Sequence, residues 1–345
     1  MISSRRSLRL AAVTVAALSL AACGGSHRKA VASSSSPTPT TTAPSTTAAP
    51  VPAAPAFNPF TGGKPSPNGV VAVKIDDTAN GRPQVNIDKA DIVYIEQVEG
   101  GLTRLLAVYD TTLPTVEAVR STRANDPELL AQYGPVAYVA SGGAPNPLQV
   151  LARSNLKVDT NDGGGPGFAR DPNRSAPYNL TANLALIAHL LHPPTAKSIG
   201  FTFAPYSSAI ARTPRGGSLQ TVVGGTPVRF VYDAVHHRYD RVIDGVAART
   251  AAGVLISTPN VLVQYCSVTV YPQDVDVLGN PSMYTHTVGS GAVILFRDGH
   301  RIAGTWSRPT ATAGTTLRTA AGTPLALAPG GVWVVLVAAG SPLTS

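Results

Sequence analysis

The segment IVYIEQVEGGLTRLLAVY, residues 92–109, decides the fold class of this chain. Two runs rich in aliphatic and aromatic residues, 92–98 and 102–109, flank Glu99 and the pair Gly100-Gly101. Residues of these types favour strands, and glycine tolerates the backbone conformations that a tight turn between two strands requires. The segment therefore predicts a β-hairpin.

Other strand-like and helical segments surround this hairpin. We predict strands at residues 70–75, 116–119 and 136–140. We predict helices at residues 127–133, 147–153 and 180–191, with Asp126 and Asn146 as caps of the first two. Strands that alternate with short helices indicate an α/β (α+β) domain with a mixed sheet, which we place at residues 68–205.

The sequence changes character after residue 226. Short β-type runs alternate with Asp-Gly, Gly-Asn-Pro and Pro-Gly-Gly turns, and the helical period is absent. This pattern predicts a mainly antiparallel β domain at residues 226–343, with the boundary in the Pro/Gly-rich stretch 205–226. Within it, Trp306 is expected to pack on the sheet and Cys266 to be a buried structural thiol.

The first 22 residues predict an export signal. Arg5, Arg6 and Arg9 precede an apolar run of 13 residues that ends in Leu-Ala-Ala before Cys23. The run is shorter than the ~20 residues of a membrane-spanning helix. The first arginines also resemble a twin-arginine signal, so both this route and ordinary Sec export stay open.

Cys23 lies where bacterial lipoproteins carry an acylated cysteine, since Leu20-Ala21-Ala22-Cys23 resembles a lipobox. We therefore expect a lipid anchor at Cys23 that holds the chain on the extracytoplasmic face of the cell membrane. Residues 23–67 are rich in Ser, Thr, Pro and Ala, which predicts a disordered linker. A wall polymer or an envelope protein is then the expected partner.

Composition and motifs argue against several other classes. Removing the three leader arginines leaves 24 Lys+Arg against 19 Asp+Glu, a mild excess without the basic runs of nucleic-acid binders. The loop 163–167 has no following Lys-Ser/Thr and is not a phosphate loop. His189 and His192 have no carboxylate partner in the sequence, so we expect neither a metal site nor a cofactor.

Several motifs together resemble the YerB-type lipoproteins, whose two domains are catalogued as domain of unknown function 3048. They are Val73–Asp77, Arg82-Pro83-Gln84, Ala90–Tyr94, Val98–Arg104, Val119–Arg123, Arg170-Asp171 with Arg174, Ala176–Leu180, Gly304–Trp306 and Pro329–Trp333. The resemblance implies a two-domain envelope lipoprotein and supplies no activity. Asp77 stands where these proteins commonly have Asn, and Tyr178 where they commonly have His, so a catalytic histidine of relatives would be missing here.

Charged residues concentrate in the first domain and form the candidate site. The candidate ligand-binding residues are Asp76, Arg82, Glu99, Arg104, Arg120, Arg123, Arg170 and Arg174. Arginine forks hold carboxylates, so these residues either pair with one another or form a pocket for an anionic wall component. The sequence leaves both interpretations open.

A hydrolase is the alternative function. It would need paired carboxylates, and the candidates are Asp76 with Glu96 or Glu99. Glu96 and Glu99 are three residues apart on a predicted strand and would face opposite sides. The leading hypothesis is therefore a non-enzymatic binding module, which would show each carboxylate already bridged to an arginine.

Overall fold

The computed structural model describes residues 56–276 and 278–345. The predicted signal, Cys23 and most of the predicted linker lie outside these residues. The last part of that linker, residues 56–67, is ordered instead, because Phe60 packs in the core and Asn58 donates to Asp110. The described residues belong to one compact unit with two hydrophobic core clusters. Within the described part of the chain, the helices are too short or too polar to span a membrane.

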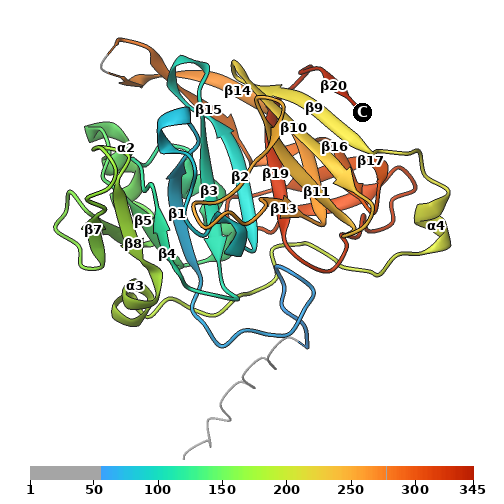
Figure 1. Ribbon diagram of the computed structural model, residues 1–345, viewed down its shortest axis with the longest axis horizontal. Helices are drawn as coiled ribbons and strands as arrows, with labels where there is room; N and C mark the ends of the chain where they lie inside the picture. The colour runs from blue at the N-terminus through green and yellow to red at the C-terminus, as the bar shows by residue number, and fades with distance from the viewer. Residues whose placement is uncertain (1–55, 277) are drawn as a thin grey trace, which may run out of the picture. The chain divides into compact units, whose positions relative to one another are not determined.

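The predicted hairpin is confirmed and forms the centre of an 11-stranded mixed sheet (Figure 1). Strands β2 (Ile92–Gln97) and β3 (Thr103–Tyr109) pair in antiparallel register on either side of Gly100 and Gly101. Strand β1 (Val71–Asp76) pairs with the other edge of β3. Parallel strands β5 (Ala137–Ala140) and β6 (Lys157–Thr160) complete this side of the sheet.

The same sheet continues into the second half of the chain. Strand β19 (Val332–Ala338) lies between β2 and β14 (Asn260–Val275) and runs parallel to both. Antiparallel strands β16 (Gly289–Arg297), β17 (His300–Arg308) and β18 (Thr316–Thr319) follow, and β15 (Pro281–His286) pairs with β14. The two halves of the sequence therefore share one hydrogen-bonded sheet.

Two smaller sheets flank the large one. A 6-stranded antiparallel sheet contains β9 (Ser218–Val223), β10 (Thr226–Asp233), β11 (Arg238–Ile243), β12 (Val246–Ala247), β13 (Ser257–Thr258) and β20 (Leu343–Thr344). A 3-stranded sheet contains β4 (Thr115–Glu117), β7 (Phe168–Arg170) and β8 (Leu180–Asn183). The predicted fold class, a mixed α/β first half and a mainly antiparallel β second half, is confirmed.

The helices are short, and the prediction was wrong in three details. The α-helices are α1 (Asp126–Leu130), α2 (Pro145–Ala152), α3 (Leu184–Leu191) and α4 (Ser208–Ala211), and single 3-10 turns lie at Ala79–Gly81, Ile87–Lys89, Glu99–Gly101 and Ala131–Tyr133. Residues 180–183 form a strand instead of a helical turn, and Asn183 caps α3 by accepting a hydrogen bond from the Leu186 N–H. Asp126 and Asn146 lie inside their helices and do not cap them. Both side chains instead bind partners distant in sequence.

Strand β1 has apolar residues on both faces of the sheet and buried charged residues toward its carboxyl end. Its odd-numbered residues pack in one hydrophobic cluster, whereas Ala72 belongs to the cluster on the opposite face. Lys74 and Asp76 follow Ala72 on that second face and are fully buried. Buried charges require partners, so charged and polar side chains should gather at this end of the sheet. In the second half, Trp306 and Cys266 are buried as predicted.

Candidate functional site

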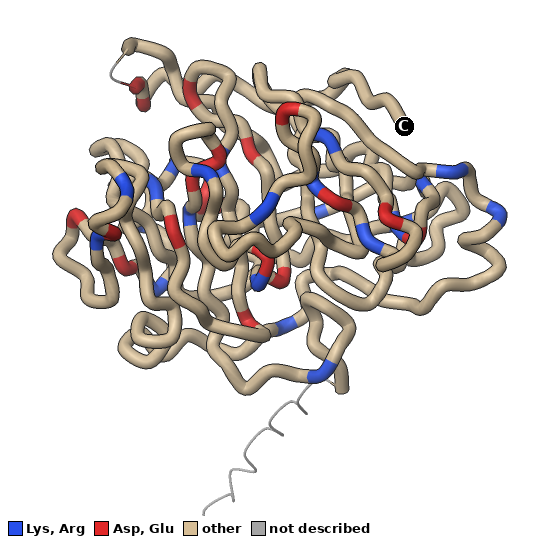
Figure 2. The backbone as a smooth tube through the Cα atoms, in the orientation of Figure 1, with Lys and Arg blue, Asp and Glu red and all other residues tan. Residues whose placement is uncertain are grey.

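The candidate site lies at the carboxyl ends of β1, β2 and β5, which run in the same direction. Because β3 runs the opposite way, it begins at this edge with Thr103 and Arg104. Arg104 is in register with Asp76 on one side and with Glu96 on the other. Side chains directly opposite each other share a face of the sheet. Figure 2 shows charges of both signs gathered over these strand ends.

Arg104 is the least satisfied charged group of this site. It is only 9% exposed, and its Nε and Nη1 atoms have no hydrogen-bond partner among the described residues. Burial lowers its pKa to about 9, the neighbouring Arg123 and Arg120 add to this effect, and Asp76 and Glu99 oppose it. A buried guanidinium group with open donors favours an anion.

Arg120 connects Arg104 to the molecular surface. Its Nε lies 3.3 Å from the Asp76 Oδ2, and its guanidinium group lies 4.9 Å from the centre of the Tyr178 ring. Asp76 also accepts hydrogen bonds of 2.6 Å from the backbone N–H and the hydroxyl of Thr78. Both of these bonds go to the Asp76 Oδ1, whereas Oδ2 has the Arg120 ion pair and no hydrogen-bond partner among the described residues.

Glu99 and Arg123 form a two-pronged ion pair. The Arg123 Nε and Nη2 atoms donate to the two Glu99 carboxylate oxygens at 2.5 Å each. Ser282, from β15, donates to Glu99 as well. Burial would raise the pKa of Glu99, but the bonds from Arg123 and Ser282 outweigh it and lower the pKa to about 2. Arg104, Arg120 and Arg123, with Asp76 and Glu99, are called the arginine cluster below.

A second charged network lies deeper and has no exposed side chain. Lys74 donates to Glu96 and, at 2.7 Å, to Asp126. Asp126 also accepts from the Tyr138 hydroxyl at 2.5 Å, and Glu96 accepts from the Asn125 amide at 2.8 Å. Burial raises the pKa of Glu96, although Lys74 opposes this effect. The network is closed to solvent and therefore supports the fold beneath the arginine cluster.

Arg82 and Arg174 lie at the border of the site. The Arg174 Nη2 donates to the backbone oxygen of Asn80 at 3.2 Å, and its Nη1 lies 3.4 Å from the Glu117 carboxylate. A cavity of 410 Å³ lies beside these residues and beside the Tyr178 ring that Arg120 contacts. It is lined by Asn80, Arg82, Arg174, Ser175, Ala176 and Tyr178, and is called the Tyr178 cavity. Arg170 lies apart from the cluster, exposed and bonded to Asn179.

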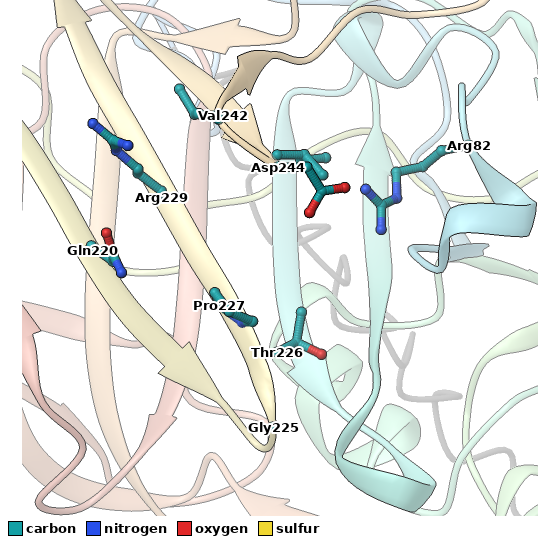
Figure 3. Close-up of a pocket in the computed structure, with 10 residues that line it drawn as sticks. Arg82, Gln220, Gly225, Thr226, Pro227, Arg229, Val242 and Asp244 are labelled. Atoms are coloured by element: carbon teal, nitrogen blue, oxygen red, sulfur yellow. The ribbon is translucent and has the colours of Figure 1, made fainter.

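Arg82 also borders a second cavity, of 420 Å³, that the sequence did not indicate. Figure 3 shows Arg82 and Asp244 pointing toward each other across it, with Arg229 on the wall formed by β10. Arg82 comes from the loop after β1, and Asp244 from the turn after β11. The two halves of the chain thus both contribute to the polar surface around Arg82.

A buried ion pair between the halves was also missed. The Arg241 Nη2 donates to the Asp77 Oδ2 at 2.7 Å, and the Arg241 guanidinium group lies 5.1 Å from the centre of the Trp333 ring. The Thr103 hydroxyl donates to the same Asp77 oxygen. The pairing joins residues 164 positions apart, so nothing in the local sequence around either residue could reveal it.

The carboxylates proposed for a hydrolase are each bound to a cation. Asp76 contacts Arg120, Glu96 contacts Lys74, and Glu99 contacts Arg123. Asp76 and Glu96 are separated by the whole of β3, with Arg104 between them. Among residues 56–276 and 278–345, no group of three or more His, Cys, Asp or Glu side chains is arranged to hold a metal ion.

Comparisons with known proteins place this architecture in a family. Residues 60–195 match the model described as protein of unknown function (DUF3048), N-terminal domain, and residues 219–334 match the corresponding C-terminal domain. No curated protein matches the chain.

The fold is also similar to the crystal structure of the YerB protein from Bacillus subtilis. The TM-score is 0.69 at 22% sequence identity, over 84% of this chain and 99% of that chain. At this level of identity the likeness shows a shared fold. The predicted resemblance to the YerB-type proteins is confirmed, and the chain belongs to the DUF3048 family.

Proposed function

We propose that this chain is a lipoprotein of the extracytoplasmic membrane face whose arginine cluster binds an anionic group of a cell-wall component or envelope protein. The single observation that supports binding is the buried Arg104 guanidinium group, whose Nε and Nη1 atoms have no partner in the described chain. Leaving such donors unsatisfied costs free energy, and an oxyanion ligand would recover it. The arginine cluster contains three cations and two carboxylates, so it also retains one positive charge.

The position of the cluster supports access for a ligand. Arg120 is close to Arg104 and stacks on Tyr178, whose ring lines the Tyr178 cavity. An anion that enters this cavity meets Arg82 and Arg174, which line it, and the Tyr178 ring that Arg120 contacts. Planar guanidinium groups bind carboxylates and phosphates through two parallel bonds, and wall polymers carry both groups.

Sedimentation with purified cell-wall sacculi tests the binding proposal. Residues 53–345 are incubated with sacculi, with sacculi stripped of phosphate polymers, and with sacculi whose carboxylates are amidated. Arg104→Met should weaken binding roughly tenfold or more, because a hydrogen bond to a charged group contributes about 1.5–3 kcal/mol. Arg153→Met, which removes the same charge from an exposed site at the end of α2, should bind like the parent chain. Equal losses in both variants would contradict a specific site.

The lipid anchor is tested separately. The proposal rests on Cys23 following a short apolar leader with Leu-Ala-Ala at its end. Cells grown with a palmitate analogue should label the parent chain and not Cys23→Ala. Unlabelled parent chain recovered with the cytosolic contents would contradict the proposed location without affecting the arginine cluster.

The alternative, a wall hydrolase acting through Asp76 with Glu96 or Glu99, has less support. A general acid or nucleophile must face its substrate, and these three carboxylates face Arg120, Lys74 and Arg123. Soluble wall fragments released by the parent chain and not by Asp76→Ala would favour this alternative over binding.

A further inference from the structure

A third cavity, far from the arginine cluster, has a different chemistry. It is lined by the segment around α4 and by residues of β17. Figure 1 shows α4 and β1 toward opposite ends of the molecule in this view. The cavity volume of 590 Å³ is within the range of small-molecule sites. Alanine, isoleucine, leucine and proline make up most of its lining, and no aromatic ring contributes. The cavity therefore suits a flexible aliphatic group better than a sugar or an aromatic ring, which favour stacking.

One charged residue lies in this apolar wall. Arg297, at the end of β16, is fully buried and lines the cavity. Its Nε donates to the Asp298 carboxylate at 2.7 Å, and its Nη1 donates to the Ala326 backbone oxygen at 3.0 Å. Its Nη2 has no acceptor among the described residues. A buried donor of this kind favours a ligand that brings an oxygen atom to it.

The covering segment suits the entry of a ligand. The helix α4 has no buried residue, although Ile210 is partly covered and lines the cavity. Before α4, the Ala204 N–H donates to the Leu327 oxygen, which fixes one end of the segment. A short helix that buries no side chain contributes little to stability, so opening this cover costs little free energy.

We propose that this cavity binds a single-chain anionic amphiphile, with the acyl chain on the alanine-rich wall and a carboxylate oxygen at the Arg297 Nη2. Burial of the acyl chain supplies affinity, because each methylene group that leaves water adds a favourable hydrophobic contribution. The Arg297 donor supplies selectivity for the acid over uncharged lipids of the same length. The site is independent of the arginine cluster and of the anchor on Cys23.

Displacement of a fluorescent fatty acid by palmitic acid, measured on purified residues 53–345, tests this proposal. The matched competitor is the alcohol of the same chain length. Palmitic acid should bind about tenfold more tightly than the alcohol, the effect of one hydrogen bond to a charged group. Equal affinities would overturn the role of Arg297, and absence of displacement by either compound would overturn the site itself.

Filling the cavity provides the second arm of the test. Ala303 lines the cavity and keeps an exposed surface, so Ala303→Trp should occupy the space without unfolding the chain. Ala251→Trp, in an exposed turn elsewhere, is the control for an added indole ring. Ala303→Trp should lose at least tenfold in affinity while Ala251→Trp keeps it. Unchanged binding by Ala303→Trp, with circular dichroism confirming its fold, would overturn the proposal.

Discussion

Glu99 keeps its charge in a buried position because Arg123 binds both of its oxygens. The ordinary pKa of 4.5 is lowered to about 2 in the folded protein. A carboxylate with a lowered pKa stabilises the fold above its unfolded pKa, and this contribution disappears as the pH falls through the folded value. Glu99 should therefore contribute roughly 3 kcal/mol near neutral pH, which is lost between about pH 4.5 and pH 2.

The first prediction follows from this shift. Glu99→Gln should lower the free energy of unfolding at pH 7 and flatten its dependence on pH between about 4.5 and 2. Urea denaturation of the parent chain and the variant across this pH range provides the measurement. A variant whose pH dependence equals that of the parent would show that Glu99 has no special role in acid unfolding.

Asp77 and Arg241 form the second test at the scale of single residues. Breaking a buried ion pair by changing one partner typically costs about 3–5 kcal/mol, because the remaining charge is left uncompensated. Asp77→Asn and Arg241→Gln should each be destabilising, and the double variant should lose less than the sum of the two. A double-mutant cycle by urea denaturation gives the coupling, and strict additivity would contradict the pair.

The sequence predicted which charged residues form the site better than it predicted which of them pair with one another. Asp76, Arg104, Arg120, Arg123 and Glu99 do lie together. Their roles could not be assigned, because which arginine faces which carboxylate depends on strand register. Arg297 and its cavity gave no signal, since a lone arginine at the end of a strand resembles any surface residue.

At the scale of elements, the turn after β1 depends on Gly81. A Cβ atom at this position would lie 2.4 Å from the Asp76 Cβ, closer than atoms can approach. Because Arg120 and Thr78 hold Asp76, the turn would have to move instead.

We therefore predict that Gly81→Ala loses about 1–3 kcal/mol of stability and weakens anion binding by the arginine cluster. Gly217→Ala is the control, since its Cβ would meet no atom within 4 Å. Thermal denaturation and the sacculus assay measure both effects. Parent-like behaviour of Gly81→Ala would show that the turn adapts without disturbing Asp76.

Local patterns predicted some elements and misled at others. The hairpin of β2 and β3 is determined by adjacent residues and a glycine turn, so it could be predicted. Residues 180–191 form an apolar run that suits a strand or a helix. Asn183 divides this run. Its side chain caps the helix that follows, and the residues before it pair in the three-stranded sheet.

At the scale of the whole molecule, β19 binds the two halves into one sheet. It pairs in parallel with β2 over Val332–Val335 and with β14 over Val332–Ala338. Parallel pairing between segments so far apart leaves no local sequence signal, and the shared sheet could not be predicted. The limits 68–205 and 226–343 given to the two domains stay predictions.

We predict one cooperative unfolding transition for residues 53–345. Separating the halves would expose the edges of β2 and β19 and leave the Arg241–Asp77 pair unmatched, so neither half should melt before the other. Scanning calorimetry should give a calorimetric enthalpy equal to the van't Hoff enthalpy. Residues 53–205 produced alone should lack a cooperative transition, and two resolved peaks in the longer chain would contradict the prediction.

The position of β19 in the chain also determines when folding can finish. Strand β2 leaves the ribosome some 240 residues before the partner that covers its edge, which starts only at Val332. Until β19 has been synthesised, the edge of β2 has no strand to pair with, and an unpaired strand edge favours aggregation. Completion of the central sheet would therefore wait until the segment that contains β19 has been synthesised.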